Sequence, residues 1–470
     1  MITISAIAAM MTFAAASEEE MQKQIDTLEA QVKQLSEMQK KQEKKQKYTQ
    51  KKLSKVNKQS ANDNIKWDVD LRATWDNIGY DLNDGSSKSN PSVYTTRLYL
   101  GMAAKPFDNL LFKGQLAMYK TWGGNHLDVD ILTKDWQESS RPDENVLRVK
   151  EAYFVYKINP SQKIPVSFSV GRRPSTVGFL ANHRQGDDKS GSPLAHITNM
   201  EVDAAMFKFD FDNILLPGSF IKTVYGRAHD PINQKIGNLG YTYKDHGTDD
   251  DYVDFFIVPM GIYNDGQHNL MAQYSLILNS KGTNIKDPAK PIKKAAAGTT
   301  QMGALSYQLD GLNEDVDFLD GSTFFASAAF TSTNPDSGYE MLGSTSGKTG
   351  HSFWTGFLFP DMITDGGRFG IEYNYGSKYW TPMTWAEDTI IGSKIATRGS
   401  AYEGYWNIPI IGKNLTAQLR YTYIDYDYRS NTFCYWDTPE YQPDPNAGDY
   451  QDGGGTDIAH DFRLFVRYQY

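Results

Sequence analysis

The sequence predicts an all-β fold, namely an antiparallel transmembrane β-barrel of about 16 strands preceded by a helical coiled-coil segment. Three observations lead to this prediction. Segments of roughly ten residues alternate between apolar and polar side chains. The connections between these segments alternate between long and short, and the last segment ends on an aromatic residue. A membrane barrel accounts for all three, because its outer face meets lipid and its inner face meets water.

The strand segments have a period of two. In the first one, Trp67, Val69 and Leu71 alternate with Asp68 and Asp70. This period places the two sets on opposite faces of a strand, and a strand of about ten residues can cross a bilayer at a tilt. The predicted strands are 65–76, 93–105, 110–122, 146–158, 166–173, 201–211, 219–228, 252–262, 268–278, 301–310, 322–331, 351–360, 368–378, 399–408, 415–426 and 460–470.

Long and short connections alternate along the chain. The short ones are 106–109, 159–165, 212–218, 263–267, 311–320, 361–367 and 409–414. The long ones are 79–92, 123–145, 174–200, 229–251, 279–300, 332–350, 379–398 and 427–459. Outer-membrane barrels have brief periplasmic turns and extended external loops, so this alternation favours the membrane barrel. Since the first connection is long, the N-terminus is expected on the periplasmic side.

The last strand carries its apolar side chains at every second position. Arg463 and Arg467 lie between them, and only Phe465 breaks the pattern. This ending resembles the C-terminal signal of bacterial outer-membrane proteins, which the barrel-assembly machinery reads. The alternative is an ordinary amphipathic strand that closes a soluble β-protein. The residues of the expected assembly signal are Phe462, Leu464, Val466, Tyr468 and Tyr470.

Residues 1–16 predict a signal peptide. They form a short apolar run, with Ala14 and Ala16 at the −3 and −1 positions of a signal-peptidase site. No Lys or Arg precedes the run, so either the true start lies upstream or the signal is weak. Export to the bacterial outer membrane is the expected localisation.

Residues 17–60 predict a periplasmic coiled-coil stalk ahead of the barrel domain, which spans 65–470. The apolar residues recur with the 4-3 spacing of a heptad seam, and the segment is rich in Lys, Gln and Glu. The alternative is a single solvated amphipathic helix. The first seam residues are Met21, Ile25, Leu28, Val32 and Leu35.

The composition excludes several classes of function. A net charge of −9 gives no sign of nucleic-acid binding. Cys434 is the sole cysteine, so an internal disulfide framework is excluded, and no Cys/His spacing suits a metal. The eight histidines are scattered without a nucleophile motif, so neither an enzyme nor a cofactor is expected.

A barrel of about sixteen strands is too wide for its own side chains to fill, so it leaves an aqueous lumen. The layout resembles bacterial porins, and a helical stalk joined to a barrel resembles the sucrose-type and phosphate-selective porins. This resemblance implies a homotrimer in outer-membrane lipid that lets small polar or charged solutes diffuse. The alternative is a structural anchor or adhesin with a plugged barrel. In that case the stalk would contact the cell wall or a periplasmic partner.

The inner wall is expected to be basic, which favours anions in a pore. For each arginine, the alternative is a structural ion pair with a neighbouring carboxylate. The connection 174–200 corresponds to the loop that enters the lumen in general porins, and the alternative is an external loop. The candidate lining and constriction residues are Arg72, Arg97, Lys113, Arg148, Lys150, Arg172, Arg173, Arg184, Asp187, Asp188, Lys189, Arg420, Arg463 and Arg467.

Overall fold

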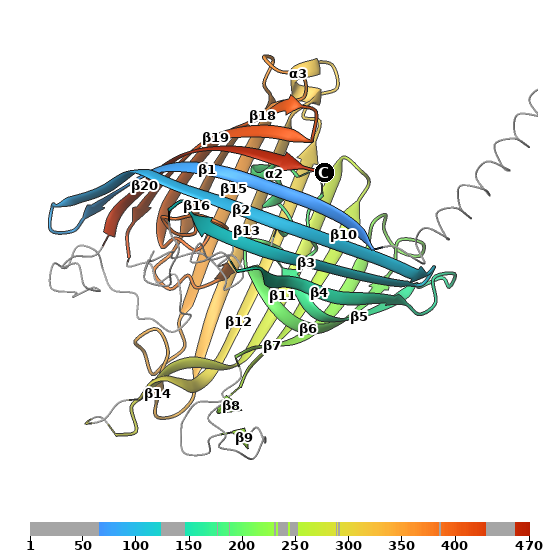
Figure 1. The fold of residues 1–470 in the computed structure, drawn as a ribbon. Helices are drawn as coiled ribbons and strands as arrows, with labels where there is room; N and C mark the ends of the chain where they lie inside the picture. The colour runs from blue at the N-terminus through green and yellow to red at the C-terminus, as the bar shows by residue number, and fades with distance from the viewer. Residues whose placement is uncertain are drawn as a thin grey trace, which may run out of the picture. The chain divides into compact units, whose positions relative to one another are not determined.

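The chain forms a closed antiparallel barrel of 16 strands (Figure 1). Consecutive long strands pair around the whole barrel, and β1 closes it by pairing with β20. The computed structural model describes residues 65–123, 146–175, 177–187, 189–229, 232–233, 243–244, 252–287, 289, 292–384, 387–428 and 456–470. The predicted signal peptide 1–16, the predicted stalk 17–60 and Asp188 lie outside these residues.

The barrel strands agree with the sixteen predicted segments, including 219–228 and 252–262, in which the alternation is ambiguous. Their bounds are β1 (Lys66–Leu82), β2 (Ser87–Phe107), β3 (Leu110–Thr121), β4 (Arg148–Lys157), β5 (Val166–Ser175), β6 (Thr198–Asp210), β7 (Phe220–His229), β10 (Val253–Asn264), β11 (His268–Asn284), β12 (Ile292–Asp310), β13 (Thr323–Pro335), β15 (Thr349–Pro360), β16 (Arg368–Gly376), β18 (Gly399–Ile411), β19 (Leu415–Tyr426) and β20 (Thr456–Gln469).

Several short elements complete the fold. The helix α2 (Asn182–Gln185) precedes β6, and α3 (Asp317–Asp320) lies in the turn before β13. Two short strands extend the large sheet, and two others pair only with each other. These strands are β8 (Ile232–Asn233), β9 (Tyr243–Lys244), β14 (Tyr339–Glu340) and β17 (Met383–Thr384).

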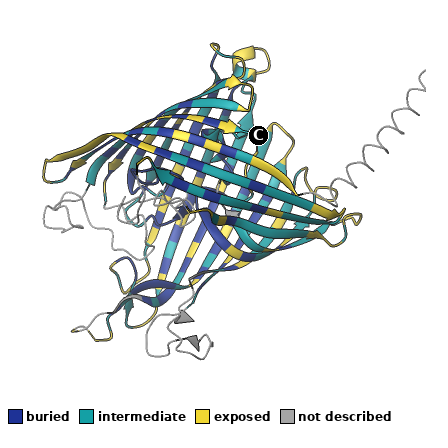
Figure 2. Cartoon of the chain, in the orientation of Figure 1, coloured by how far each residue is buried: buried dark blue, intermediate teal, exposed yellow. Residues whose placement is uncertain are grey.

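Burial alternates along the strands and separates an inner from an outer face (Figure 2). On β1, Arg72 is 1% exposed, whereas Leu71 is 42% exposed. On β20, Arg463 is 1% exposed and Leu464 is 37% exposed. Phe465, which broke the sequence pattern, faces inward and lies against Arg72, with 5.2 Å between the guanidinium carbon and the ring centroid. The outer face is therefore apolar and the inner face is polar.

The two ends of the barrel differ as the connection lengths predicted. The short connections 108–109, 158–165, 211–219, 265–267, 311–322, 361–367 and 412–414 lie at one end, here called the short-turn end. The C-terminus lies at the same end (Figure 1). Within the described part of the chain, no helix is long and apolar enough to cross a bilayer.

Two predicted long connections are shorter than expected, because their strands continue. The loop predicted at 79–92 is a hairpin whose strands break only at 83–86, and the loop predicted at 279–300 breaks at 285–291. The backbone ladder persists there although the apolar alternation has ended. Polar side chains on both faces of a strand, as in 87–90, hide such an extension from the sequence.

Two connections from the opposite end turn into the barrel and pack against its inner wall. The first inward segment is 177–197, and the second is 387–398. The first contributes Phe179, Leu180 and Leu194 to a buried apolar cluster on the inner wall. The second contributes Ile390 and Ile391 to another cluster. The core of the molecule thus consists of inward wall side chains packed on these two segments.

Candidate functional site

The first inward segment crosses the lumen and bonds to strands far apart in the sequence. His183 lies at α2, its Nε2 lies 3.0 Å from Gln308 Oε1 on β12, and its ring stacks on Phe325. Gln418 of β19 donates to the backbone oxygen of Arg184 at 2.6 Å. The described part of the connection predicted at 174–200 therefore lies within the barrel, with α2 against its inner wall.

Another part of the same segment is held by a buried histidine. Nδ1 of His196 lies 2.7 Å from the hydroxyl of Ser327, and Nε2 lies 2.8 Å from the hydroxyl of Ser352. The rings of Trp354 and Trp380 pack edge-on against its imidazole. Burial lowers the pKa of His196 to about 3, so the imidazole is neutral at physiological pH. This neutral contact pins the segment to β13 and β15.

The second inward segment carries charges that pair with the wall. Lys394 Nζ donates to Glu372 Oε2 on β16 at 2.6 Å and also pairs with Glu403 on β18. Glu387 lies 3.7 Å from Arg184, so an ion pair also joins the two inward segments. The side chains of Lys394, Glu372 and Glu403 are 3%, 1% and 0% exposed. The prediction of 379–398 as an external loop is therefore wrong for its described residues.

Asp388 of the second inward segment occupies a cradle of basic and hydroxyl groups, defined here as Arg72, Arg97 and Tyr119. Its carboxylate accepts hydrogen bonds from all three of these side chains, with 3.2 Å to Arg97 Nη1. Arg463 Nη1 donates to the backbone oxygen of Asp388 at 2.7 Å. Burial alone would raise the pKa of Asp388, but Arg72, Arg97 and Arg463 hold this pKa well below its usual range. Asp388 is therefore an anion under all ordinary conditions.

The remaining inner-wall arginines of this sector face carboxylates. Arg463 pairs with Asp76 through Nε and lies 3.8 Å from Asp461. The nearest carboxylate to Arg420 is Glu403, at 3.8 Å, and no nitrogen of its guanidinium group has a hydrogen-bond partner. The structural ion pairs considered as the alternative in the sequence analysis are therefore present.

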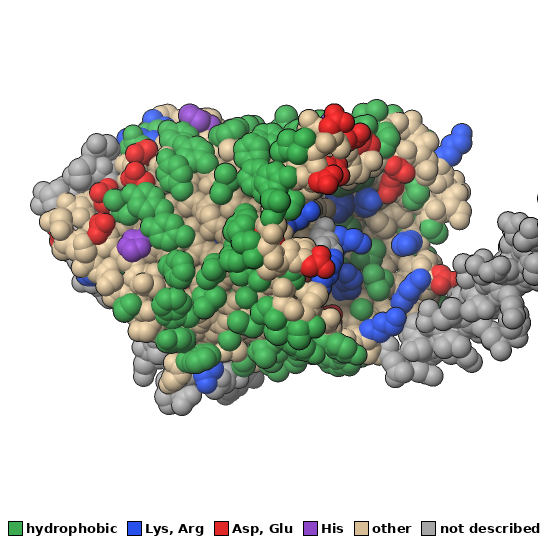
Figure 3. All heavy atoms as spheres, turned by 90° about the horizontal axis from the view of Figure 1, so that it is seen from above, with side chains coloured by type: hydrophobic (Ala, Val, Ile, Leu, Met, Phe, Trp, Pro, Cys, Tyr) green, Lys and Arg blue, Asp and Glu red, His purple; other side chains and the backbone are tan. Residues whose placement is uncertain are grey.

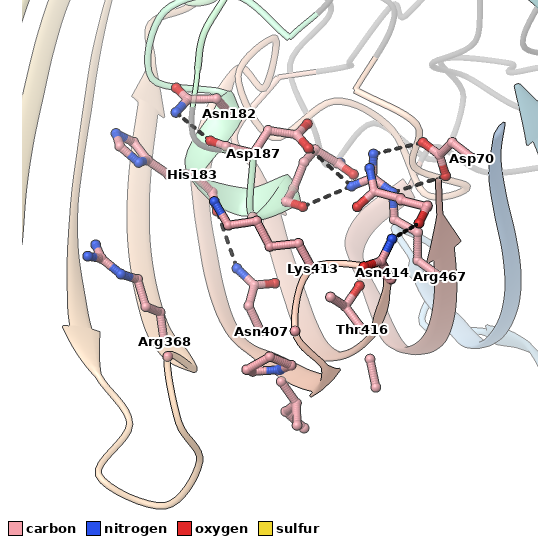
Figure 4. Close-up of a pocket in the computed structure, with 18 of the residues that line it drawn as sticks. Asp70, Asn182, His183, Asp187, Arg368, Asn407, Lys413, Asn414, Thr416 and Arg467 are labelled. Carbon is pink, nitrogen blue, oxygen red and sulfur yellow. Dashed lines mark hydrogen bonds and ion pairs between the residues drawn. The ribbon is translucent and has the colours of Figure 1, made fainter. Parts of the chain in front are cut away.

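A cavity of about 850 Å³ opens at the short-turn end and reaches α2 (Figure 4). Arg467 lines it, with Nη2 donating to Asp70 at 2.7 Å and Nη1 lying 3.3 Å from Asp187. Burial raises the pKa of Asp187, and Arg467 opposes that shift. Amide side chains such as Asn182 and Asn407 line the same cavity. Figure 3 shows a hollow in which Lys and Arg side chains gather, with acidic side chains at its rim.

The other predicted site residues lie on the inner face of the barrel wall, on its outer face, or in exposed connections. Lys113 is exposed on the inner side, and the half-buried Arg148 is in register with the buried Ala117. Lys150 Nζ donates to Glu201 at 2.9 Å. Arg173 faces inward and lies 4.6 Å above the Tyr153 ring.

Arg172 lies on the other face of β5. Its shorter ion pair, at 2.8 Å, is with the buried Glu201, which also pairs with Lys150, and its register partner Asp203 lies at 3.4 Å. It shares its face with Val170, which is 37% exposed on the outer wall. Lys189 is exposed. The structure therefore brings Arg72, Arg97, Arg184 and Arg463 together with the second inward segment. It brings Arg467 together with the first inward segment and places Arg172 elsewhere.

Sequence reasoning missed the partners supplied by 387–398. Asp388 lies 316 residues from Arg72, so no local spacing relates them. The apolar residues of the segment, Ile390, Ile391 and Ile395, are the signal that was present, because an external loop has no reason to hold them. Within the described ranges, no group of three or more His, Cys, Asp or Glu side chains could hold a metal ion.

The apolar exterior, the charged interior and the sixteen antiparallel strands define a porin-like β-barrel. The chain belongs to the DUF3373 family, described as "Protein of unknown function (DUF3373)", whose profile matches residues 87–470.

Solved structures with a similar fold include OprB of Pseudomonas putida at high pH, with 13% identity, a TM-score of 0.48, and coverage of 88% of this chain and 96% of that chain. OmpF of Salmonella typhi in complex with daunomycin has 13% identity, a TM-score of 0.45, and coverage of 87% and 99%. The trimer form of in-vitro folded OmpT of Vibrio cholerae has 11% identity, a TM-score of 0.43, and coverage of 87% and 100%. These similarities concern the fold alone. The curated proteins contain no match to the chain.

Proposed function

We propose that the protein is an outer-membrane channel for the passive diffusion of small polar or charged solutes. The observation that carries this proposal is the closed barrel, which has an apolar outer face and a charged inner face. Inner-wall residues line a cavity of about 850 Å³. Lipid would cover the exposed outer side chains, such as Leu71 and Leu464. Water and solute would occupy the cavity.

A preference for anions is part of the proposal, and it rests on the accessible cations of β3, β5 and β7 and not on the buried arginines. The arginines of β1, β2 and β20 are paired with carboxylates, so they add little net field. Across β3, β5 and β7, the inward Lys113, Arg173 and Lys222 are at least partly accessible. Glu151 on β4 lies among these cations and offsets part of their charge. The remaining basic side chains of this sector favour anions, which they attract in a pore.

The second candidate function is a structural anchor with a plugged lumen. It is favoured by the two inward segments, whose buried ion pairs fix them to the wall. In this case the coiled coil predicted at 17–60 would reach a cell-wall or periplasmic partner. We also propose a homotrimer, supported by the heptad spacing in that segment.

Conductance separates the two functions. The full chain, folded in detergent and inserted in a planar bilayer, should give discrete current steps in a potassium chloride gradient. A reversal potential of anion sign would support the basic sector as the selectivity element, and a cation sign would refute that part alone. Folded protein that never conducts would refute the channel and favour the anchor. Folding is checked by the heat-dependent electrophoretic shift that closed barrels show.

A further inference from the structure

We propose that the cradle formed by Arg72, Arg97 and Tyr119 is a binding site for a small oxyanion, a carboxylate or a phosphate, and that Asp388 occupies it as a tethered competitor. The inference rests on the proposed channel function and names the class of solute that the channel binds. It is carried by the register of the wall, by spare donors in the cradle and by the position of the cavity.

The cradle is a row of like charges in direct register. Arg467, Arg72, Arg97 and Tyr119 are successive cross-strand partners on β20, β1, β2 and β3. Like charges directly opposite each other on a sheet are destabilising, so three arginines in a row require anions beside them. The wall supplies Asp70, which lies 3.0 Å from Arg97 and 2.7 Å from Arg467. The anion on Arg72 comes from the second inward segment.

Asp388 leaves part of the cradle unused. Nε and Nη1 of Arg72 are buried and have no hydrogen-bond partner, and neither has Nε of Arg97. A carboxylate on a short side chain cannot satisfy all of these donors, whereas a free oxyanion can turn to meet more of them. The cradle thus offers more donors than its resident ligand uses.

Asp388 is held at its place by a backbone conformation that few residues adopt. Its φ angle is 61°, in the left-handed region where Asp and Asn are enriched among residues with a side chain. The substitution Asp388→Asn therefore keeps the backbone and removes the charge. This makes it a clean probe of the carboxylate.

The cavity at the short-turn end lies next to the cradle, although Arg72, Arg97 and Tyr119 are not among its lining residues. Asp70, Phe465 and Arg467 line the cavity, and Asp70 and Phe465 are also direct neighbours of Arg97 and Arg72. An anion that enters the cavity meets Arg467 first and has the cradle behind it. Arg72, Arg97 and Tyr119 are between 1% and 5% exposed, so exchange requires that Asp388 and its part of the second inward segment move away from the wall.

The test measures block of chloride current by inorganic phosphate and, separately, by acetate. A tethered carboxylate acts as a ligand at millimolar effective concentration or above, so removing it should lower the half-blocking concentration by about tenfold or more. Asp388→Asn should show this lower half-blocking concentration, and the double substitution Asp388→Asn with Arg97→Gln should not show it. The matched control is Asp365→Asn, which removes one carboxylate from an exposed short turn. Its half-blocking concentrations should equal those of the wild type.

Equal half-blocking concentrations in the wild type and Asp388→Asn would overturn the proposal. If Asp388→Asn fails to fold, phosphate or acetate in the refolding buffer should restore the folded yield, and no rescue by either would also overturn it. If acetate alone restores folding or blocks the current, the cradle is a carboxylate site. If phosphate alone does so, the cradle is a phosphate site. Anion rescue of folding needs no current, so it tests the cradle even if the barrel does not conduct.

Discussion

The substitution Lys394→Met should release the second inward segment from the wall. Lys394 lies between Glu372 and Glu403, and the three side chains are between 0% and 3% exposed. Removing one partner from a buried pair leaves uncompensated charge and costs about 3–5 kcal/mol. Arg184 still lies 3.4 Å from Glu403, so the lower end of this range applies. A loss of about 3 kcal/mol lowers the equilibrium constant for docking of the segment more than a hundredfold.

Two measurements read out this release. Single-channel recordings should show higher conductance or frequent larger substates, and limited proteolysis of the folded barrel should show faster cleavage within 387–398. Lys163→Met, in the exposed turn between β4 and β5, removes the same charge and should leave both readouts unchanged. Lys394→Met with Glu372→Gln should recover part of the docking, because one orphaned carboxylate is gone. A Lys394→Met barrel with wild-type conductance and wild-type cleavage would refute this account of the segment.

Three further predictions test the two faces and the interior. Leu464→Arg places a charge on the outer face and should destabilise the barrel in vesicles by about 2–4 kcal/mol. Tyr468→Arg, near the membrane edge, should cost about 1 kcal/mol or less. Equal urea midpoints for these two variants would contradict a lipid-facing wall. Arg463→Ala leaves Asp76 and Asp461 buried without their cation and should cost about 3 kcal/mol, again by urea unfolding, and adding Asp76→Asn should restore part of it. His196 is neutral when docked, with a pKa of about 3, so docking is strongest above the unfolded pKa of about 6.5 and weakens as the pH falls toward 3. At pH 5 the free energy of docking of the first inward segment is less favourable by about 2 kcal/mol, so the conductance should be higher than at pH 7.5. His196→Gln should remove this pH dependence of the conductance.

The strands were predictable because a barrel wall repeats one local rule. Each strand has one face in lipid, so a period of two survives in the sequence wherever the wall crosses the membrane. The same rule separates Arg172 from Arg173. Phe168 and Val170 face outward, so the alternation puts Arg172 outside and Arg173 inside. The sequence thus held enough information to place these two residues.

The interior could not be predicted in the same way, because its contacts join residues that are distant in the chain. Asp388 meets Arg72 and Arg97 across separations of 316 and 291 residues. Single inward arginines look the same in a sequence whether they line water or bind a carboxylate. In the sequence, only the apolar Ile390, Ile391 and Ile395 distinguish the second inward segment from an external loop. Apolar loop residues alone do not specify the part of the wall on which they pack.

The pairing of the inner wall decides where selectivity can arise. A charge that is buried and ion-paired contributes little to the potential felt by a passing solute, whereas an accessible unpaired charge contributes strongly. The arginines of β1, β2 and β20 are mostly of the first kind, since Asp70, Asp76 and Asp388 neutralise them. Lys113 on β3 is exposed on the inner face, in the basic sector of β3, β5 and β7, where Asp68 and Glu151 interact with it electrostatically but no ion pair within the described residues holds it. Neutralising that sector should therefore shift the reversal potential more than neutralising the buried arginines, unless solute displaces Asp388 and uncovers the cradle.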